Sequence, residues 1–466
     1  MSYSRRNFLM LAGSTAIGAT ALSSLEKLIG RVVEGQAARG VGYGPLSPRM
    51  PVNAGELVGV VRDGIDLGRT PILQLPPEFN YAAFSIVGQP MDDGNLVPSA
   101  HDGMAAFPGP NQTTILVRNH ELDPTSSTQV NVSKLYDTSA GGTTTLIVGS
   151  NRRVIKQWGS LGGTIRNCAG GPTPWGSWIT CEENVSVPNG TNVFKKHGYN
   201  FEVPVTANMA VADPVPLAAM GRFNHEAVAV DPATGYVYQT EDRGDSCFYR
   251  FRPNVKGNLR SGGVLEALVI EGMPTVNTAT NFSQYKGQAL PVSWVHISDV
   301  DPDTDTVRFE AQDKGAAKFS RGEGAWYGNN QIYFTCTSGG DARFGQVFAY
   351  NVSTETLTLV IESPGRDVLD YPDNITVAPF GDLMLCEDGS GGNTDNYIVG
   401  VNQAGELYQF AKNNINDSEY AGACFSPDGN TMFVNIYSPG ITMAIWGPWN
   451  RRRGWRMLAL PQLFSS

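Results

Sequence analysis

Three segments far apart in the chain end in matching acidic residues. They read Thr180-Cys181-Glu182-Glu183, Gln239-Thr240-Glu241-Asp242 and Leu385-Cys386-Glu387-Asp388. Carboxylate oxygens are the ligands that hard cations such as calcium prefer. Because an apolar run with strand-like character precedes each acidic pair, we expect the acids to lie at strand ends.

The same layout recurs upstream of the acidic tips. A polar or acidic residue is followed by an apolar stretch and by a turn rich in Gly, Pro or Asn. This layout predicts a β-hairpin, in which the first residue of one strand lies beside the last residue of the other. We therefore expect Glu226 beside Glu241, and Asn374 beside Glu387. Weaker copies, which bring the number of units to six, begin near His101, Gly322 and Gly422.

Further strands follow several of these hairpins, which gives about four strands in a unit of roughly 50 to 60 residues. This organisation predicts an all-β fold: a six-bladed β-propeller with an irregular N-terminal extension. Its radial symmetry would bring the acidic tips to one end of a central channel. Like charges so close to one another must be protonated or neutralised by bound cations. The alternative is that each acid only accepts hydrogen bonds in its own tight turn.

The N-terminus carries a twin-arginine pattern. Arg5 and Arg6 precede a modest apolar run that ends near Leu22. The pattern predicts a Tat signal peptide over residues 1–38, carried by the Tat translocase, and a single propeller domain over residues 39–466. No other stretch has the length and apolar character of a membrane helix. We therefore expect a periplasmic or secreted protein without a membrane partner after export.

Charge and cysteine usage narrow the possible partners. A formal net charge of −10 argues against nucleic acid. Most of the six cysteines lie inside strand-like runs, where a buried, apolar role is more common than a disulfide. Cys181 differs because it adjoins two carboxylates at a strand end. A thiolate there favours a transition metal, whereas the surrounding oxygen ligands favour calcium.

These features together resemble the PhoX-type alkaline phosphatase family, from about Phe84 to Trp446. Besides the Tat signal, the resemblance rests on Arg118-Asn119-His120-Glu121, Thr180-Cys181-Glu182-Glu183-Asn184, Asn224-His225-Glu226-Ala227 and Thr240-Glu241-Asp242-Arg243. It implies an exported phosphatase with a six-bladed propeller and an active site that holds iron and calcium. It also implies that Cys181 binds iron and that Asn119 and Glu121 approach the metal cluster, with Asn119 in contact with the substrate phosphate. The remaining metal ligands that it implies are Glu182, Glu226, Glu241, Glu323 and Glu387.

The groups that grip the phosphate are less well defined by the resemblance. Better-known members of the family are longer, and basic residues in their additional segments hold the phosphate. The candidates in this chain are Arg118, Arg243, Arg321 and Arg343, because each adjoins a loop that we expect at the acidic end of the central channel. The alternative for each is an ion pair with a nearby carboxylate. His120 and His225 would either orient neighbouring ligands or form structural hydrogen bonds.

The leading hypothesis is an exported enzyme that hydrolyses small phosphate monoesters with iron and calcium. Cations would neutralise the developing charge, and no protein nucleophile is required. One alternative is a calcium-dependent propeller hydrolase, such as a lactonase or a phosphotriesterase, which needs only hard ligands. The other is a non-catalytic exported scaffold that its metal ions stabilise.

Overall fold

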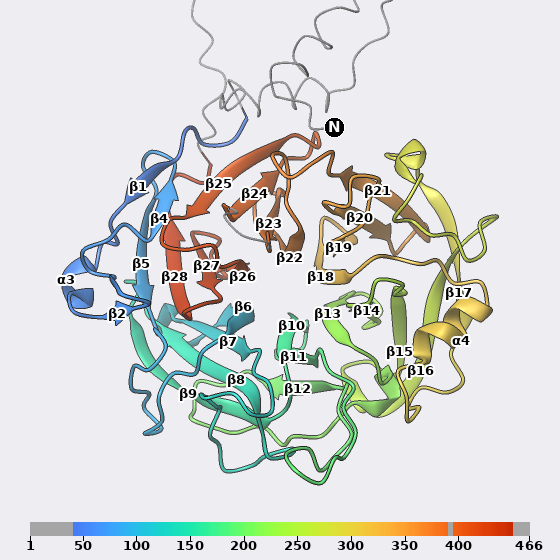
Figure 1. Cartoon of the computed structure of the whole chain (residues 1–466), viewed down its shortest axis with the longest axis horizontal. Helices are drawn as coiled ribbons and strands as arrows, with labels where there is room; N and C mark the ends of the chain where they lie inside the picture. Colours follow the sequence, from blue (N-terminus) through green and yellow to red (C-terminus); the bar gives the residue numbers. More distant parts are fainter. Residues whose placement is uncertain (1–40, 390–394, 451–466) are drawn as a thin grey trace, which may run out of the picture.

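The computed structural model describes residues 41–389 and 395–450, so the expected signal peptide at residues 1–38 lies outside the described residues. The described chain is mainly β, with its sheets arranged around a central axis as in a propeller (Figure 1). Neighbouring strands within the sheets are antiparallel. The predicted all-β class and propeller-like arrangement are confirmed.

The strands form the following sheets, given in their order of pairing. One sheet contains β6 (His101–Pro108), β7 (Thr114–His120), β8 (Ser139–Val148) and β9 (Val154–Gly163). The next contains β10 (Asn167–Pro172), β11 (Ser177–Glu182) and β12 (Asn200–Pro204). A larger sheet contains β13 (His225–Val230), β14 (Val237–Glu241), β15 (Tyr249–Val255), β16 (Asn258–Ile270), β17 (Leu290–His296), β21 (Thr356–Glu362), β20 (Gln346–Asn351), β19 (Gln331–Cys336) and β18 (Gly322–Gly328).

Two further sheets combine segments from both ends of the chain. The first contains β22 (Pro372–Val377), β23 (Leu383–Glu387), β24 (Tyr397–Val401), β25 (Leu407–Asn413), β4 (Leu73–Leu75) and β1 (Ser47–Arg49). The second contains β26 (Tyr420–Phe425), β27 (Thr431–Ile436), β28 (Ile441–Trp446) and β5 (Asn80–Phe84). The pairing of β5 with β28 closes the structure, because it covers the outer edge of the last hairpin with an N-terminal strand.

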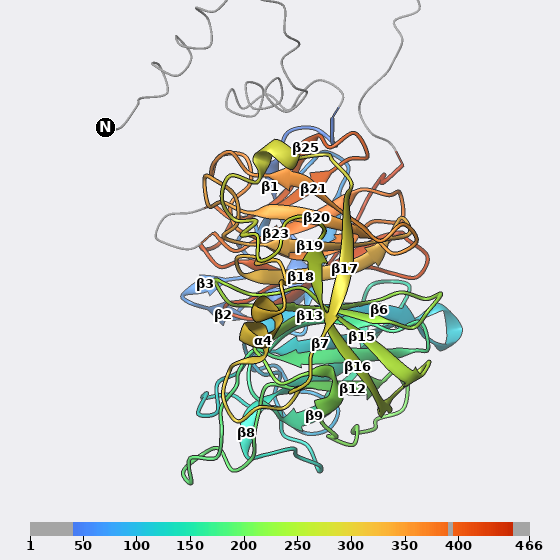
Figure 2. The same ribbon diagram turned by 90° about the vertical axis from the view of Figure 1, so that its right-hand side faces the viewer.

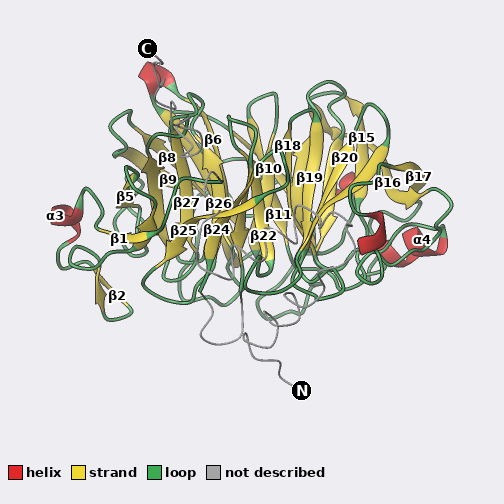
Figure 3. Cartoon of the chain, turned by 90° about the horizontal axis from the view of Figure 1, so that it is seen from above, coloured by secondary structure: helices red, strands yellow, loops and turns green. Residues whose placement is uncertain are grey.

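The remaining elements are short and lie outside the main sheets. Strands β2 (Val61–Arg62) and β3 (Ile65–Asp66) form a small hairpin in the N-terminal part of the described chain. Helices α3 (Ala54–Leu57) and α4 (Val307–Asp313) lie at the periphery, as the view from above shows (Figure 3). Figure 2 views the edge that carries α4. No helix in the described residues has the length and apolar character needed to cross a membrane.

The innermost strands of these sheets contact one another in a closed ring within the described chain. Its order is β6, β10, β13, β18, β22 and β26, and β26 returns to β6. Close approach in this ring depends on glycine. A Cβ on Gly171 would lie 1.9 Å from the carbonyl oxygen of Val228, and one on Gly422 would lie 2.4 Å from that of Asp102. The absence of a side chain at these positions therefore lets neighbouring inner strands pack backbone to backbone.

Each inner hairpin has a register shift near the start of its inner strand, between positions such as His225 and Val228 in β13. The shift changes the expected pairs. His225, rather than Glu226, lies opposite Glu241, and Pro372, rather than Asn374, lies opposite Glu387. An extra residue in one strand alters which side chains face a given direction. The predicted register was therefore wrong at these positions.

Candidate metal centre

A cluster of carboxylates lies where the inner hairpins converge. Some of these acids belong to the first residues of the inner strands or directly precede them, and others directly follow the second strand of a hairpin. They interact electrostatically across the sheets. The members of this hub cluster are Asp102, Glu121, Glu183, Glu226, Asp242, Glu323, Asp373, Asp388 and Glu419.

Burial and mutual repulsion make the hub cluster a poor site for unneutralised charge. Burial, followed by the charge of Glu323, raises the pKa of Glu226 well above its usual value. Burial and Asp388 raise the pKa of Asp373 to about 7. Burial and Glu121 raise the pKa of Glu183 to about 8. The carboxylates must therefore hold protons or be neutralised by cations, as expected for like charges in a partly desolvated site.

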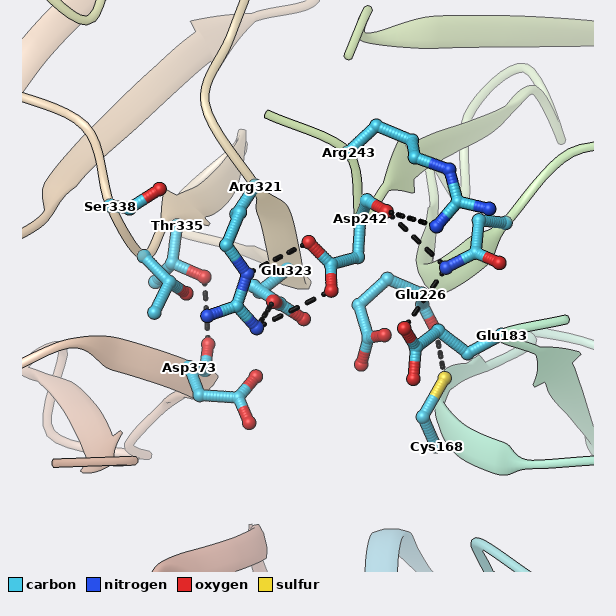
Figure 4. Close-up of polar contacts among 12 residues, drawn as sticks. Cys168, Glu183, Glu226, Asp242, Arg243, Arg321, Glu323, Thr335, Ser338 and Asp373 are labelled. Atoms are coloured by element: carbon cyan, nitrogen blue, oxygen red, sulfur yellow. Dashed lines mark hydrogen bonds and ion pairs between the residues drawn. The ribbon is translucent and has the colours of Figure 1, made fainter. Parts of the chain in front are cut away.

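Two groups of three acids have the geometry to hold a metal ion. In each group the carboxylate oxygens lie within 4.8 Å of one another. Figure 4 shows Glu226, Glu323 and Asp373 of the first group approaching a common space. Asp373 also belongs to the second group, with Asp388 and Glu419. Its Oδ1 is buried and has no hydrogen-bond partner in the described residues, which fits an oxygen atom available to a cation.

Two arginines cross-link the acids of the hub cluster. Arg321 donates to Asp242 at 2.9 Å and to Glu323 at 2.7 Å. Arg166 bonds Glu121 and also Glu183. Both guanidinium groups thus join acids from different hairpins and offset part of their charge. Arg166 did not emerge from the sequence analysis, because nothing in its local pattern marks it as a hub residue.

The cysteine beside the hub cluster is Cys168. Its Sγ lies 3.3 Å from the carbonyl oxygen of His225. It also lies 3.7 Å from the carbonyl oxygen of Glu226 (Figure 4). Burial, and then the charges of Glu226 and Glu183, raise its pKa well above that of a free thiol. Cys181 belongs to the same apolar cluster as Cys168, but burial alone raises its pKa. All six cysteines are buried and unpaired in the described chain, as the sequence analysis favoured.

The structure divides the predicted metal ligands into two sets. Glu121, Glu226 and Glu323 lie in the hub cluster. The carboxylates of Glu182, Glu241 and Glu387 are buried in hydrogen bonds to loops beside the strand ends. Glu182 accepts from Ile165 N, Gly198 N, Tyr199 N and His197 Nδ1. Glu241 accepts from Tyr249 Oη and Cys247 N, and Glu387 accepts from Asp370 N and Tyr397 N.

Strand geometry explains this division. Successive side chains at the end of a strand point in opposite directions. When Glu182 faces the loop, its neighbour Glu183 faces the hub, where it bonds Arg166. Asp242 and Asp388 follow Glu241 and Glu387 in the same way and belong to the hub cluster. Each acidic pair therefore contains one acid that accepts hydrogen bonds from a neighbouring loop and one acid that belongs to the hub cluster.

The residues predicted to contact the substrate are held in other interactions. Asn119 donates to the carbonyl oxygens of Cys168 and Ala169, at 3.0 and 2.6 Å, and accepts from Trp178 Nε1 at 2.9 Å. These bonds attach β7 to β10 and β11. Arg243 donates to Asp305 at 2.8 Å and is partly exposed.

Arg118 is fully buried and bonds neutral groups. It donates to Thr442 Oγ1 at 2.6 Å, to Thr144 Oγ1 at 3.0 Å and to Ser85 Oγ at 3.1 Å. These partners lie on or directly after β28, β8 and β5, so Arg118 ties the first inner sheet to the closing sheet. Burial lowers its pKa to about 9.

The two histidines near the hub also make structural bonds. His120 is hydrogen-bonded through Nδ1 to the Ser99 carbonyl oxygen and through Nε2 to Thr144 Oγ1, at 2.8 and 2.9 Å. His225 Nε2 bonds the Gly221 carbonyl oxygen at 2.9 Å, and burial lowers the pKa of His225 to about 3. Of the two roles considered for these histidines, structural hydrogen bonding is the one that the contacts support.

Comparison with known proteins yields a family match and structural matches. The sequence profile of the family described as alkaline phosphatase PhoX matches residues 62–440. Pseudomonas fluorescens PhoX in complex with vanadate, a transition state analogue, aligns with a TM-score of 0.60 and 17% identity, over 81% of this chain and 96% of that chain. A Xanthomonas campestris gluconolactonase, XC5397, aligns with a TM-score of 0.40 and 10% identity, over 87% of this chain and 99% of that chain. No curated protein matches the sequence.

Proposed function

The chain belongs to the alkaline phosphatase PhoX family and is a phosphoric monoester hydrolase, and on this premise we propose that it uses iron and calcium held in the hub cluster. We also infer that the fold is a six-bladed propeller, with one blade for each strand of the inner ring. The vanadate bound by the Pseudomonas fluorescens protein supports a phosphoryl group as the reacting part of the substrate. The substrate is accordingly a small phosphate ester.

The oxygen-rich part of the hub cluster suits calcium. Glu226, Glu323 and Asp373 would hold one ion, because their oxygens already lie within the span of a coordination shell. Asp373, Asp388 and Glu419 would hold a neighbouring ion through the same Asp373 side chain. These sets replace Glu241 and Glu387, whose oxygens are used by loop hydrogen bonds.

The thiol of Cys168 is the group that suits iron. Thiolate is a soft ligand that favours a transition metal over calcium. Cys168 lies against Glu226, and the charges of Glu226 and Glu183 contribute to its raised pKa. We therefore assign the sulfur ligand to Cys168 and not to Cys181. A bound cation would also lower the pKa of this thiol, which burial raises in the protein alone.

The bound cations would supply charge neutralisation at the phosphoryl group during its transfer. The chain itself fixes where that group can bind. Arg321 holds Asp242 and Glu323 in place, and its side chain is 37% exposed and lines the adjacent cavity. Arg166 fixes Glu121 and Glu183 on the other side. Rigid, fixed acids of this kind preserve the spacing that the ions require.

The cellular location forms a further part of the proposal. The twin-arginine segment supports export by the Tat translocase and a periplasmic or secreted protein. Tat export carries folded proteins, which suits a protein that acquires its metal ions before transport. Family membership supports the phosphatase over the lactonase and scaffold alternatives.

The observation that carries the proposal is the convergence of Glu226, Glu323 and Asp373. Its test is hydrolysis of p-nitrophenyl phosphate by the purified protein before and after chelation. We expect chelation to abolish the activity, and iron together with calcium to restore it. Unchanged activity after complete metal removal would contradict the proposal.

A further inference from the structure

A cavity lined mainly by polar and charged residues opens directly beside the hub cluster. Its volume is about 530 Å³. Arg321 lines the cavity and also bonds Glu323, so the cavity adjoins the candidate metal centre. Figure 4 shows Arg321 and Arg243 on opposite sides of Asp242. The complete lining is Asp242, Arg243, Gly244, Asn277, Ala279, Thr280, Ser320, Arg321, Ser338 and Arg343.

Basic residues outnumber acidic residues in the cavity lining. The lining contains three arginines and one carboxylate, that of Asp242. Arg243 and Arg321 already form ion pairs with acids. Arg343 is exposed and forms no ion pair with any residue in the described ranges. Its guanidinium is therefore available to a ligand, while hydroxyl and amide groups of the lining can complete a polar site.

Two of these arginines occupy backbone conformations that favour glycine or asparagine. The φ angles are 53° at Arg321 and 59° at Arg343. A side chain with a Cβ makes the left-handed region costly, and such strain is concentrated at functional sites. An arginine at a position where a smaller residue would be more stable is consistent with a requirement for its charge.

Hydrogen bonds fix the two loops that form the outer wall. Asp341 accepts from Asn281 N at 2.6 Å and from Ser283 Oγ at 3.2 Å, which ties the loop after β16 to the turn that carries Arg343. Ser320 and Ser338 are hydrogen-bonded through their hydroxyls at 2.9 Å. The wall is thus preorganised, which reduces the entropic cost of binding an anion there.

We propose that this cavity binds a second anionic group carried by the leaving alcohol of the substrate. The inference rests on the proposed phosphatase function. With the ester phosphate at the hub, the remainder of the substrate extends past Arg321 towards Arg343. A second phosphate or a carboxylate has the charge and the oxygen geometry to accept two parallel hydrogen bonds from the guanidinium group of Arg343. The preferred substrates are therefore bisphosphates or phosphorylated acids.

The test compares matched substrates that differ in one anionic group. Fructose 1,6-bisphosphate against fructose 6-phosphate probes a second phosphate, and 3-phosphoglycerate against glycerol 3-phosphate probes a carboxylate. We expect the wild-type protein to have a higher kcat/KM for the member that carries the second anionic group in at least one pair. Arg343→Asn, which suits a positive φ, should lower that preference by roughly 10- to 100-fold, because it removes a charge-assisted contact.

Two further variants separate a specific contact from a general charge effect. Arg343→Lys should retain part of the preference, since lysine keeps the positive charge but cannot form the paired hydrogen bonds of a guanidinium group. Arg69→Asn removes an exposed arginine that forms an ion pair with Asp66, neither of which lines the cavity, and should leave the preference unchanged. Melting temperatures would establish that each variant is folded.

The possible failures are distinguishable. If the metal-loaded wild-type protein hydrolyses the esters but shows no preference in either pair, or if Arg343→Asn keeps the wild-type preference, the second-anion site is overturned and the phosphatase remains. If the metal-loaded protein hydrolyses none of the esters, the proposed function fails, and the second-anion site fails with it.

Discussion

Glu182 and Glu183 are consecutive residues whose carboxylates serve different parts of the molecule. Glu182 lies 2.6 Å from His197 Nδ1 and accepts backbone N–H groups of adjacent loops. Glu183 bonds Arg166 in the hub cluster. The same division applies to Glu241 and Asp242. The acidic pairs therefore combine loop support with a contribution to the candidate metal centre, and the two roles can be separated by mutation.

Glu182→Gln should mainly reduce stability. It replaces a carboxylate, whose two oxygens accept several hydrogen bonds, with an amide that has one acceptor oxygen and one NH2 donor group. Some buried N–H groups then lack a partner, which lowers the free energy of unfolding by about 1–3 kcal/mol. Glu183→Gln should mainly reduce metal affinity. Denaturant unfolding and metal titration of the two variants, side by side, measure the difference. A greater loss of metal affinity in Glu182→Gln would contradict this assignment.

The metal-free protein should become less stable as the pH rises. Burial and neighbouring acids raise the pKa of Asp373 to about 7 and of Glu183 to about 8. The folded chain therefore retains protons that the unfolded chain releases at about pH 4 to 5. Their contribution is complete below that range and is lost as the pH rises towards about 8. Melting temperatures in a chelator should fall over this interval.

Metal ions should weaken this pH dependence, because they neutralise the carboxylates in place of protons. The same melting series with calcium and iron provides the control. A melting temperature that rises with pH in the chelator would show that the hub acids do not repel one another in the folded protein.

The two cysteines of this region should respond differently to serine. Cys168→Ser should lower the iron content of the purified protein together with its phosphatase activity, because the hydroxyl is a poor ligand for a soft metal. Cys181→Ser should keep its iron but lose about 1–3 kcal/mol of stability, because it places a hydroxyl in an apolar cluster. Elemental analysis and unfolding curves check both. Iron loss only in Cys181→Ser would restore the assignment made from sequence.

Asn119→Ala should be a stability variant. Asn119 makes three buried hydrogen bonds between neighbouring sheets, and their loss leaves Trp178 and two carbonyl groups without that partner. We expect a loss of about 1–3 kcal/mol and a KM for p-nitrophenyl phosphate close to that of the wild type. A large increase in KM with normal stability would instead indicate contact between Asn119 and the phosphate.

The repeat and its strand periodicity were sufficient to predict the class of fold. Apolar runs that end in acids mark the hairpins, and the hub location of Glu226 and Glu323 followed from their position at the start of an inner strand. The register did not follow, because the shifts near residues such as His225 change which side chain faces the hub. Sequence periodicity does not reveal a shift of this kind.

Other features of the candidate site depend on contacts between distant segments. Arg166 directly precedes β10 and has a φ angle of 46°, and only the fold brings its side chain to Glu121. Cys168 lies in a strand-like run with no adjacent acid in the sequence, whereas Cys181 adjoins two. Proximity along the chain therefore favoured Cys181, although the packing of β10 against β13 places Cys168 beside Glu226.

Anomalous X-ray diffraction from crystals of the iron- and calcium-loaded protein would show whether the hub acids hold cations. We expect an ion among Glu226, Glu323 and Asp373 and an iron signal next to Cys168. A hub without ions, or ions bound only at Glu241 and Glu387, would contradict it.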